Sequence, residues 1–271
     1  MVALRTVYAW EIRKLILQRR TYLGFGIAFI VPLIFVIALA LQSGQPDDVA
    51  FGRYVRQSGL AIPPVILIFA SIWLFPLVTS LVAGDIVAAE DHNGTLKTIL
   101  TRSSGRGRIF VAKVLAALTY AGLALTLMGV TAVVAGVAKS GFHPLISLSG
   151  TTVSPGKALA LIAVCFAIYA LPLIAVASIA LLLSTLTHNS AASIVGALMI
   201  SLMLQLITIL PGLESLQPYL LPTQFNAWQG LLRDPVDWAP IVRAIWVCAL
   251  YSVPCLGYAY WSFTRRDVTG G

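Results

Sequence analysis

Six long apolar stretches alternate with short polar segments along the chain. A helix rises 1.5 Å per residue, so about 20 apolar residues cross the roughly 30 Å hydrocarbon layer of a bilayer. Each stretch is long enough for this, and none contains Asp, Glu, Lys, Arg or His; their cores are 21–41, 60–83, 114–138, 158–187, 190–210 and 244–263. The pattern predicts an all-α integral membrane protein with six transmembrane helices.

Composition supports this assignment. The chain has 271 residues, of which 59% are hydrophobic and 10% charged, whereas soluble domains carry about 25% charged residues. We expect a membrane domain over 21–263, preceded by an interfacial helix over 1–20 and followed by a cytoplasmic tail over 264–271. Six spans and their loops leave no room for a separate soluble catalytic domain.

The basic residues predict the orientation. Twelve of the 18 Lys and Arg residues fall before the first span, between the second and third, or after the sixth. Because Lys and Arg favour cytoplasmic loops, both termini and the loop 84–113 are expected in the cytoplasm. This distribution explains the net charge of +8 without nucleic acid, which would need one basic face on a soluble domain.

The N-terminal segment predicts an elbow helix lying at the cytoplasmic interface. Its apolar residues recur at helical spacing on one side, and Arg13 lies around the flank. Glu11 projects onto the apolar side, so it either pairs with a basic neighbour such as Lys14 or Arg108 or faces protein. Arg19 marks the turn into the first span.

The loop 84–113 has the most specific local pattern. Span 2 is expected to continue as helix through Glu90 and Asp91, and Asn93-Gly94 to stop it. Thr95 can cap a new short helix, in which Leu96, Ile99 and Leu100 form one apolar face. Ser103-Ser104-Gly105 ends that helix, and Arg106 begins the approach to span 3. On these grounds the loop is either a docking element for another protein or a solvated connection.

The stretch Gly84-Asp85-Ile86-Val87-Ala88-x-Glu90, with Gly94-Thr95-Leu96, Leu100-Thr101, Arg106 and Lys113 after it, resembles the signature of permease subunits of ABC-2-type ABC transporters. Glu11-Ile12-Arg13-Lys14 followed by Arg19-Arg20 is similar to that family's elbow helix. The six-span plan and the segment 211–240 before the last span fit as well. That segment holds five prolines among aromatic residues, and is expected either to dip into the outer leaflet as short helices or to form a plain external loop.

The resemblance implies a permease that pairs with a second copy or paralogue in the cytoplasmic membrane of a prokaryote. Two separate ATP-binding subunits would dock on it, and they would hold the ATP and magnesium. The docking and coupling element would comprise Glu90, Asp91, Gly94, Thr95, Leu96, Ile99, Leu100 and Arg106. Export of an amphiphilic or hydrophobic substrate, such as a drug, peptide antibiotic or lipid, is the expected activity.

Other classes of function are less favoured. A passive or ion-coupled secondary transporter is the main alternative. The uncharged spans argue against it, because ion-coupled transporters use ionisable groups inside their spans. Gly150 to Ala158 is a poor match to a phosphate-binding loop, so no ATP site is expected in this chain. The three histidines fall in three different loops, which argues against a metal site or an intramembrane enzyme, and no catalytic residue is assigned. Ser71, Gln205 and Thr208 are candidates to line the transport pathway or to pack helices.

Overall fold

The computed structural model describes residues 3–41, 51–92, 94 and 105–265. Nearly all regular structure in these ranges is helical. The α-helices are α1 (Leu4–Leu17), α2 (Arg19–Leu41), α3 (Ile62–Ile72), α4 (Leu74–Ala83), α5 (Ala88–His92), α7 (Arg106–Ser140), α8 (Pro155–Thr187), α9 (Ser190–Ile207), α10 (Leu221–Gln224) and α11 (Ala239–Arg265). Short 3-10 helices are η1 (Gly52–Tyr54), η2 (Gly59–Ala61), η3 (Gln217–Tyr219) and η4 (Ala227–Leu232), and the strands are β1 (Leu145–Ile146) and β2 (Thr152–Val153).

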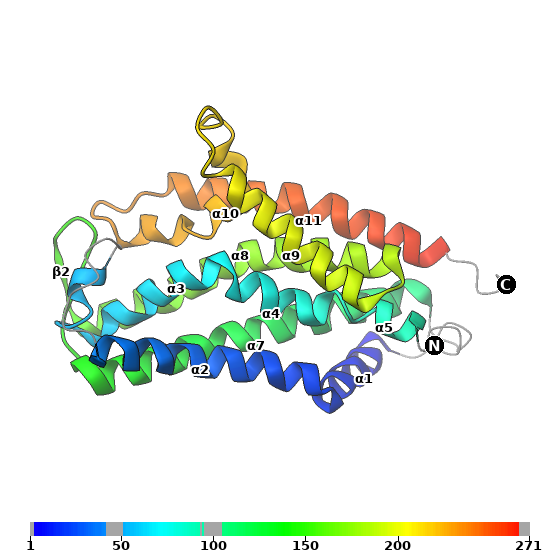
Figure 1. The fold of residues 1–271 in the computed structure, drawn as a ribbon, viewed down its shortest axis with the longest axis horizontal. Coiled ribbons are helices and arrows are strands. Elements are labelled where there is room, and N and C mark those ends of the chain that lie inside the picture. Colours follow the sequence, from blue (N-terminus) through cyan, green and yellow to red (C-terminus); the bar gives the residue numbers. More distant parts are fainter. Residues whose placement is uncertain (1–2, 42–50, 93, 95–104, 266–271) are drawn as a thin grey trace.

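The long helices run side by side in an elongated bundle (Figure 1). Five of them, α2, α7, α8, α9 and α11, are individually long and apolar enough to cross a membrane, and α3 with α4–α5 makes a sixth if this bent pair is one span. The helix α1 and the last turn of α11 lie at the same end of the bundle. We call this the α1 end, and the opposite end, which carries β1 and β2, the hairpin end.

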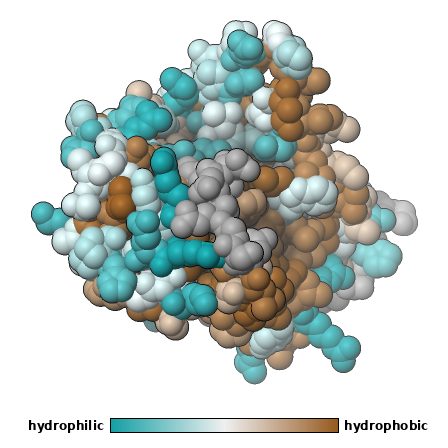
Figure 2. Space-filling view, turned by 60° about the vertical axis from the view of Figure 1, so that its left-hand side comes forward, coloured by the Kyte–Doolittle hydropathy of each residue, from teal (hydrophilic) through white to brown (hydrophobic). Residues whose placement is uncertain are grey.

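Apolar side chains cover the flanks of the bundle. On α2 and α11, large side chains such as Ile34, Ile37, Leu250 and Val253 are exposed. Figure 2 shows hydrophilic residues gathered over the hairpin end and hydrophobic residues on the adjoining flank. A flank of this kind is what a bilayer would cover, so the protein is a multi-pass helical membrane protein.

The second span is a bent pair of helices rather than the single helix expected through Asp91. The helix α3 ends at Ile72, the axes on the two sides of the break differ by 61°, and α4 then begins at Leu74. Pro76 explains the break, because its nitrogen cannot donate to the carbonyl of Ile72 and its ring crowds that carbonyl. A second interruption, between Ala83 and Ala88, separates α4 from α5. The helix stop around Gly94 is confirmed, since α5 ends at His92 and Gly94 has φ +67°.

The N-terminal segment forms a helix that ends where the basic residues predict. The helix α1 ends at Leu17, Gln18 is extended, and α2 begins at Arg19. It packs mainly against α7 and also touches α2.

Two segments at the other connections are more ordered than plain loops. Residues 145–153 form a small antiparallel hairpin in which the Ser147 hydroxyl accepts hydrogen bonds from the backbone N–H groups of Ser149 and Thr151. Residues 217–232 form short helices that pack on α8, α9 and α11, and Trp228 is fully buried there. The short helices expected between spans 5 and 6 are therefore present.

Close backbone contact fixes the hairpin end. Gly59 in η2 lies against Gly136 of α7, and a Cβ on either glycine would overlap the backbone of the other. The Gly59 N–H also donates to the carbonyl of Gly141 at 3.1 Å. The start of the second span is thus held directly on the third.

Candidate functional site: a buried ion cluster at the α1 end

Four charged side chains from three helices meet at the α1 end. Lys14 Nζ lies 3.0 Å from Glu11 Oε1 and 2.7 Å from Glu90 Oε1. Lys113 Nζ lies 3.1 Å from Glu11 Oε2 and 2.7 Å from Glu90 Oε2. Each lysine therefore bridges the same two carboxylates, and the four groups form a closed ring with no net charge. We call these four residues the ion cluster.

Local structure explains how the members of the ion cluster meet. Glu11 and Lys14 are three residues apart, so they share one face of α1. Lys113 lies one-fifth of the way along α7, against which α1 packs. Glu90 is presented by α5, whose first turn is fixed by α8, because the Ser184 hydroxyl accepts hydrogen bonds from the N–H groups of Val87 and Ala88 at 3.2 and 3.0 Å.

The ion cluster is largely removed from solvent. Lys113 is fully buried and Glu11 is 3% exposed. The third ammonium hydrogen bond of Lys113 goes to the carbonyl of Ile86 at 3.0 Å, in the turn before α5. Buried charges are tolerated only when they are paired and hydrogen-bonded, which the closed ring achieves.

Two members of the ion cluster have shifted pKa values, and both lie outside the apolar spans. Burial alone would raise the pKa of Glu90, but the attraction of Lys113 and Lys14 outweighs it and lowers that pKa. Burial alone would lower the pKa of Lys14, but the attraction of Glu90 and Glu11 outweighs it and raises that pKa. Both shifts favour the charged forms of Glu90 and Lys14.

Further polar contacts tie the other helices to the same end. Arg20 at the start of α2 pairs with Asp85, and Asp91 of α5 pairs with His188 between α8 and α9. Arg106 at the start of α7 donates from Nη1 to the carbonyl of Thr264 in α11 at 3.1 Å. The α1 end is therefore a polar junction, in which α2 and the turn between α8 and α9 contact Asp85 and Asp91, and α7 contacts α11.

The structure places the predicted coupling residues as follows. Glu90 belongs to the ion cluster, Asp91 and Arg106 make the contacts just described, and Gly94 terminates α5. The rest of the predicted short helix lies outside the described residues, namely Thr95, Leu96, Ile99 and Leu100. In the elbow helix, Glu11 and Lys14 join the ion cluster, whereas Arg13 and Arg19 are exposed.

Sequence reasoning named one of the two ion-pair partners of Glu11 and missed the other. The expected basic neighbours were Lys14 and Arg108, but its ion pairs are with Lys14 and Lys113. A signal was available, because Lys113 follows Arg106 by seven residues, about two helical turns, and directly precedes the apolar core 114–138. A cation so near an apolar segment needs a buried partner of opposite charge. Glu11, which projects onto the apolar side of the N-terminal helix, is a carboxylate that needs a buried cation in the same way.

The candidate pathway residues are not brought together by hydrogen bonds. The Ser71 hydroxyl donates to the carbonyl of Ile68, and the Thr208 hydroxyl donates to the carbonyl of Gln205. These contacts within one helical turn fit a packing role. An apolar pocket of about 260 Å³ lies at the break between α3 and α4, lined in part by Phe35, Phe69, Trp73 and Leu77, and Ser71 is not among its lining residues.

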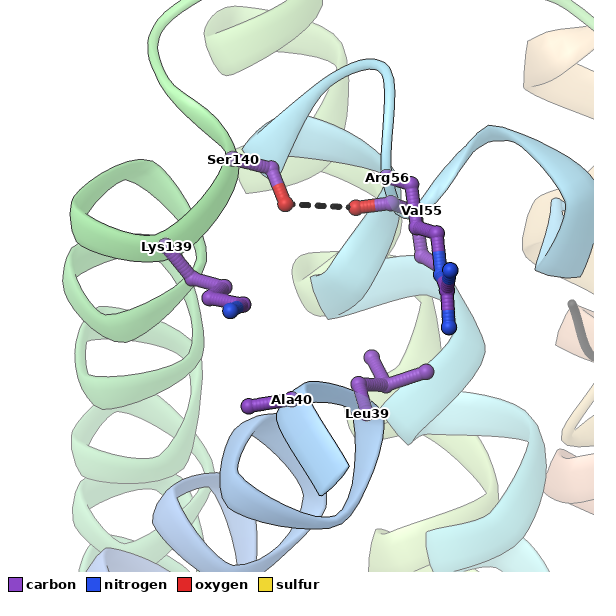
Figure 3. A pocket seen from close by; sticks show the side chains of 6 residues that line it. All are labelled: Leu39, Ala40, Val55, Arg56, Lys139 and Ser140. Carbon is purple, nitrogen blue, oxygen red and sulfur yellow. Dashed lines mark hydrogen bonds between the residues drawn. The ribbon is translucent and has the colours of Figure 1, made fainter. Parts of the chain in front are cut away.

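A second pocket, of about 310 Å³, lies at the hairpin end (Figure 3). Two cations, Arg56 and Lys139, line it together with Leu39 and Ala40. Figure 3 shows the Ser140 hydroxyl donating across its edge to the carbonyl of Val55, at 2.7 Å. Both cations are exposed, and their position agrees with a polar boundary of the bundle.

The fold and the ion cluster define a multi-pass helical membrane protein whose spans are joined by buried charges at one end. The family model described as "Protein of unknown function (DUF2705)" matches residues 29–269, so the chain belongs to this family. We found no curated protein that matches the chain.

Proposed function

We propose that this protein is the membrane-spanning permease subunit of an ATP-driven ABC transporter of the ABC-2 type. Two ATP-binding subunits would dock at the α1 end, and a second permease copy or a paralogue would complete the transporter. The α1 end would face the cytoplasm of a prokaryotic cell, with both termini on that side.

The ion cluster is the observation that carries this proposal. If another protein drives a docking element, that element must be attached rigidly to the spans. Only then is a movement at the surface transmitted to the transmembrane helices. The ring of four charges joins α1, α5 and α7, and α5 immediately precedes the segment whose sequence resembles a coupling helix. Force applied beyond Gly94 would therefore reach the third span through Lys113 and the elbow helix through Lys14.

The apolar spans support an external source of energy. Lys113 lies directly before the apolar core of α7, and its charge is balanced by the carboxylates of the ion cluster. A proton or ion pathway through the bundle would need ionisable groups at depth. The apolar pocket at the break of the second span, which opens on the flank, suits an amphiphilic or hydrophobic cargo.

Co-purification of the ATP-binding subunit with designed variants tests the proposal. Leu96→Asp and Leu100→Asp should weaken its capture, because each apolar side chain supplies about 1.5–3 kcal/mol when fully buried. Glu90→Gln keeps the shape of the side chain but unbalances the ion cluster. It should leave capture largely intact while strongly reducing transport and cargo-stimulated ATP hydrolysis.

Glu214→Ala is the matched control, since Glu214 is an exposed acid outside the α1 end. It should behave as the unmodified protein in both measurements. Normal capture and normal transport by Leu96→Asp, Leu100→Asp and Glu90→Gln together would rule out docking at this loop. ATP hydrolysis by the chain without a partner would rule out the permease assignment.

A further inference from the structure

The turn between α4 and α5 is buried and touches several spans. Residues 84–88 are all buried. Consecutive residues of the turn contact three different helices: Gly84 lies against the backbone of Ile194 in α9, Asp85 pairs with Arg20 of α2, and the carbonyl of Ile86 accepts from Lys113 of α7. The turn therefore determines where α5 begins relative to the rest of the bundle.

The fourth span supplies a further contact at the end of this turn. The N–H group of Ile86 still donates to the carbonyl of Val82 in α4, at 3.0 Å. The N–H groups of Val87 and Ala88 donate instead to Oγ of Ser184 in α8, at 3.2 and 3.0 Å. One hydroxyl group of another span thus does for these two amides what backbone carbonyls do inside a helix.

Ser184 differs in this respect from Ser178, a second buried serine of α8. The Ser178 hydroxyl donates to the carbonyl of Ile174 in its own helix, at 2.7 Å. Ser184 is fully buried, as are Val87 and Ala88. Buried N–H groups that lose their acceptor destabilise the conformation that buries them. The start of α5 therefore depends on the hydroxyl of Ser184.

We infer that Ser184 is the positioning residue for α5. The helix α5 has five residues, too few to be stable by itself, so its place depends on contacts with other helices. The ion cluster holds Glu90 and His188 pairs with Asp91, while Ser184 holds the first turn. The fourth span thus keeps α5 where Glu90 reaches the ion cluster. The docking role of α5 rests on the proposed function, whereas its placement by Ser184 does not.

Hydrogen exchange of the purified chain in detergent, resolved to single residues, tests the placement. Ser184→Ala should speed exchange at Val87 and Ala88 at least about ten-fold, because both amides lose their acceptor. Ser184→Cys nearly keeps the volume but offers only a weak acceptor, so it should act like Ser184→Ala. Ser184→Thr keeps a hydroxyl and should restore slow exchange. Slow exchange at both amides in Ser184→Ala and Ser184→Cys would overturn the inference.

Ser178→Ala is the matched control, since it removes a buried hydroxyl of the same helix. It should leave exchange at Val87 and Ala88 unchanged. Equal acceleration by Ser178→Ala and Ser184→Ala would mean that general loosening of α8 is the cause, and would also overturn the inference.

The affinity for the ATP-binding subunit tests the consequence for docking. Ser184→Ala should bind it about three-fold more weakly, because docking must then also order α5. Ser184→Thr and Ser178→Ala should bind as the unmodified chain does. Normal affinity in Ser184→Ala despite fast exchange would show that the position of α5 does not matter for docking. Failure of the unmodified chain to bind the subunit would count against the proposed function, and hydrogen exchange would still decide whether Ser184 positions α5.

Discussion

Lys113 is a fully buried cation whose ammonium group has three partners from α1, α5 and the turn before α5. In such a position the charge stabilises the fold only because its partners are present. Removing it would leave two carboxylates, Glu11 and Glu90, to share Lys14. Breaking a buried ion pair from one side typically costs about 3–5 kcal/mol.

We therefore predict that Lys113→Met strongly lowers the thermal unfolding midpoint in detergent. Lys139→Met is the matched control, since it makes the same change at an exposed position of the same helix and should shift the midpoint little. The double variant Lys113→Met with Glu11→Gln should recover part of the loss, because it restores the balance of charge. Equal midpoints for Lys113→Met and Lys139→Met would show that the ion cluster contributes nothing to stability.

At the scale of elements, the second span shows how one residue shapes a helix. Pro63 and Pro64 sit in the first turn of α3, where a missing N–H costs nothing. Pro32 and Pro172 lie inside α2 and α8 without ending them. Pro76 does coincide with a break. In the first turn of α4, the Leu77 N–H donates to the carbonyl of Trp73, the residue before the helix, at 3.0 Å.

We predict that Pro76→Ala lets α3 and α4 join and straightens the span. Spin labels at Arg56 and His92, both exposed, report the change in a background without native cysteines. Their separation, measured by pulsed electron resonance, should lengthen in Pro76→Ala and stay unchanged in the control Pro172→Ala. An unchanged separation in Pro76→Ala would mean that packing against neighbouring helices imposes the bend, rather than the proline.

The sequence predicted elements better than their junctions. Charge-free runs of about 20 residues identify spans directly, because the bilayer excludes unpaired charge. The helix end at His92 follows from the breaking residues Asn93-Gly94, and the end of α1 at Leu17 lies close to Arg19, which was predicted to mark the turn. The break at Trp73 was missed because several prolines were equally plausible and only neighbouring helices decide which one bends its span. The ion cluster was missed in part because Glu11 and Lys113 lie 102 residues apart, and no local pattern links them.

At the scale of the whole molecule, basic residues are divided between the two ends of the bundle. The α1 end carries Arg5, Arg13, Lys14, Arg19, Arg20, Arg106, Arg108, Lys113 and Arg265, and the hairpin end carries fewer, among them Arg56 and Lys139. Because the two ends lie on opposite sides of the apolar flank, this division predicts the orientation: the α1 end in the cytoplasm and the hairpin end outside.

Cysteine labelling in intact cells tests that orientation. In a background without native cysteines, Ser149→Cys, exposed in the hairpin between β1 and β2, should react with an impermeant thiol reagent added from outside. His92→Cys, exposed at the end of α5, should react only after the cells are permeabilised. Both positions lie in described, ordered segments, so the difference reports the side of the membrane rather than burial. The opposite pattern would mean that the orientation is the reverse of the predicted one. The ion cluster would then lie outside the cell, where no cytoplasmic ATP-binding subunit reaches it. Labelling of both residues in intact cells would mean that the bent pair α3–α4 turns back to the side it entered from.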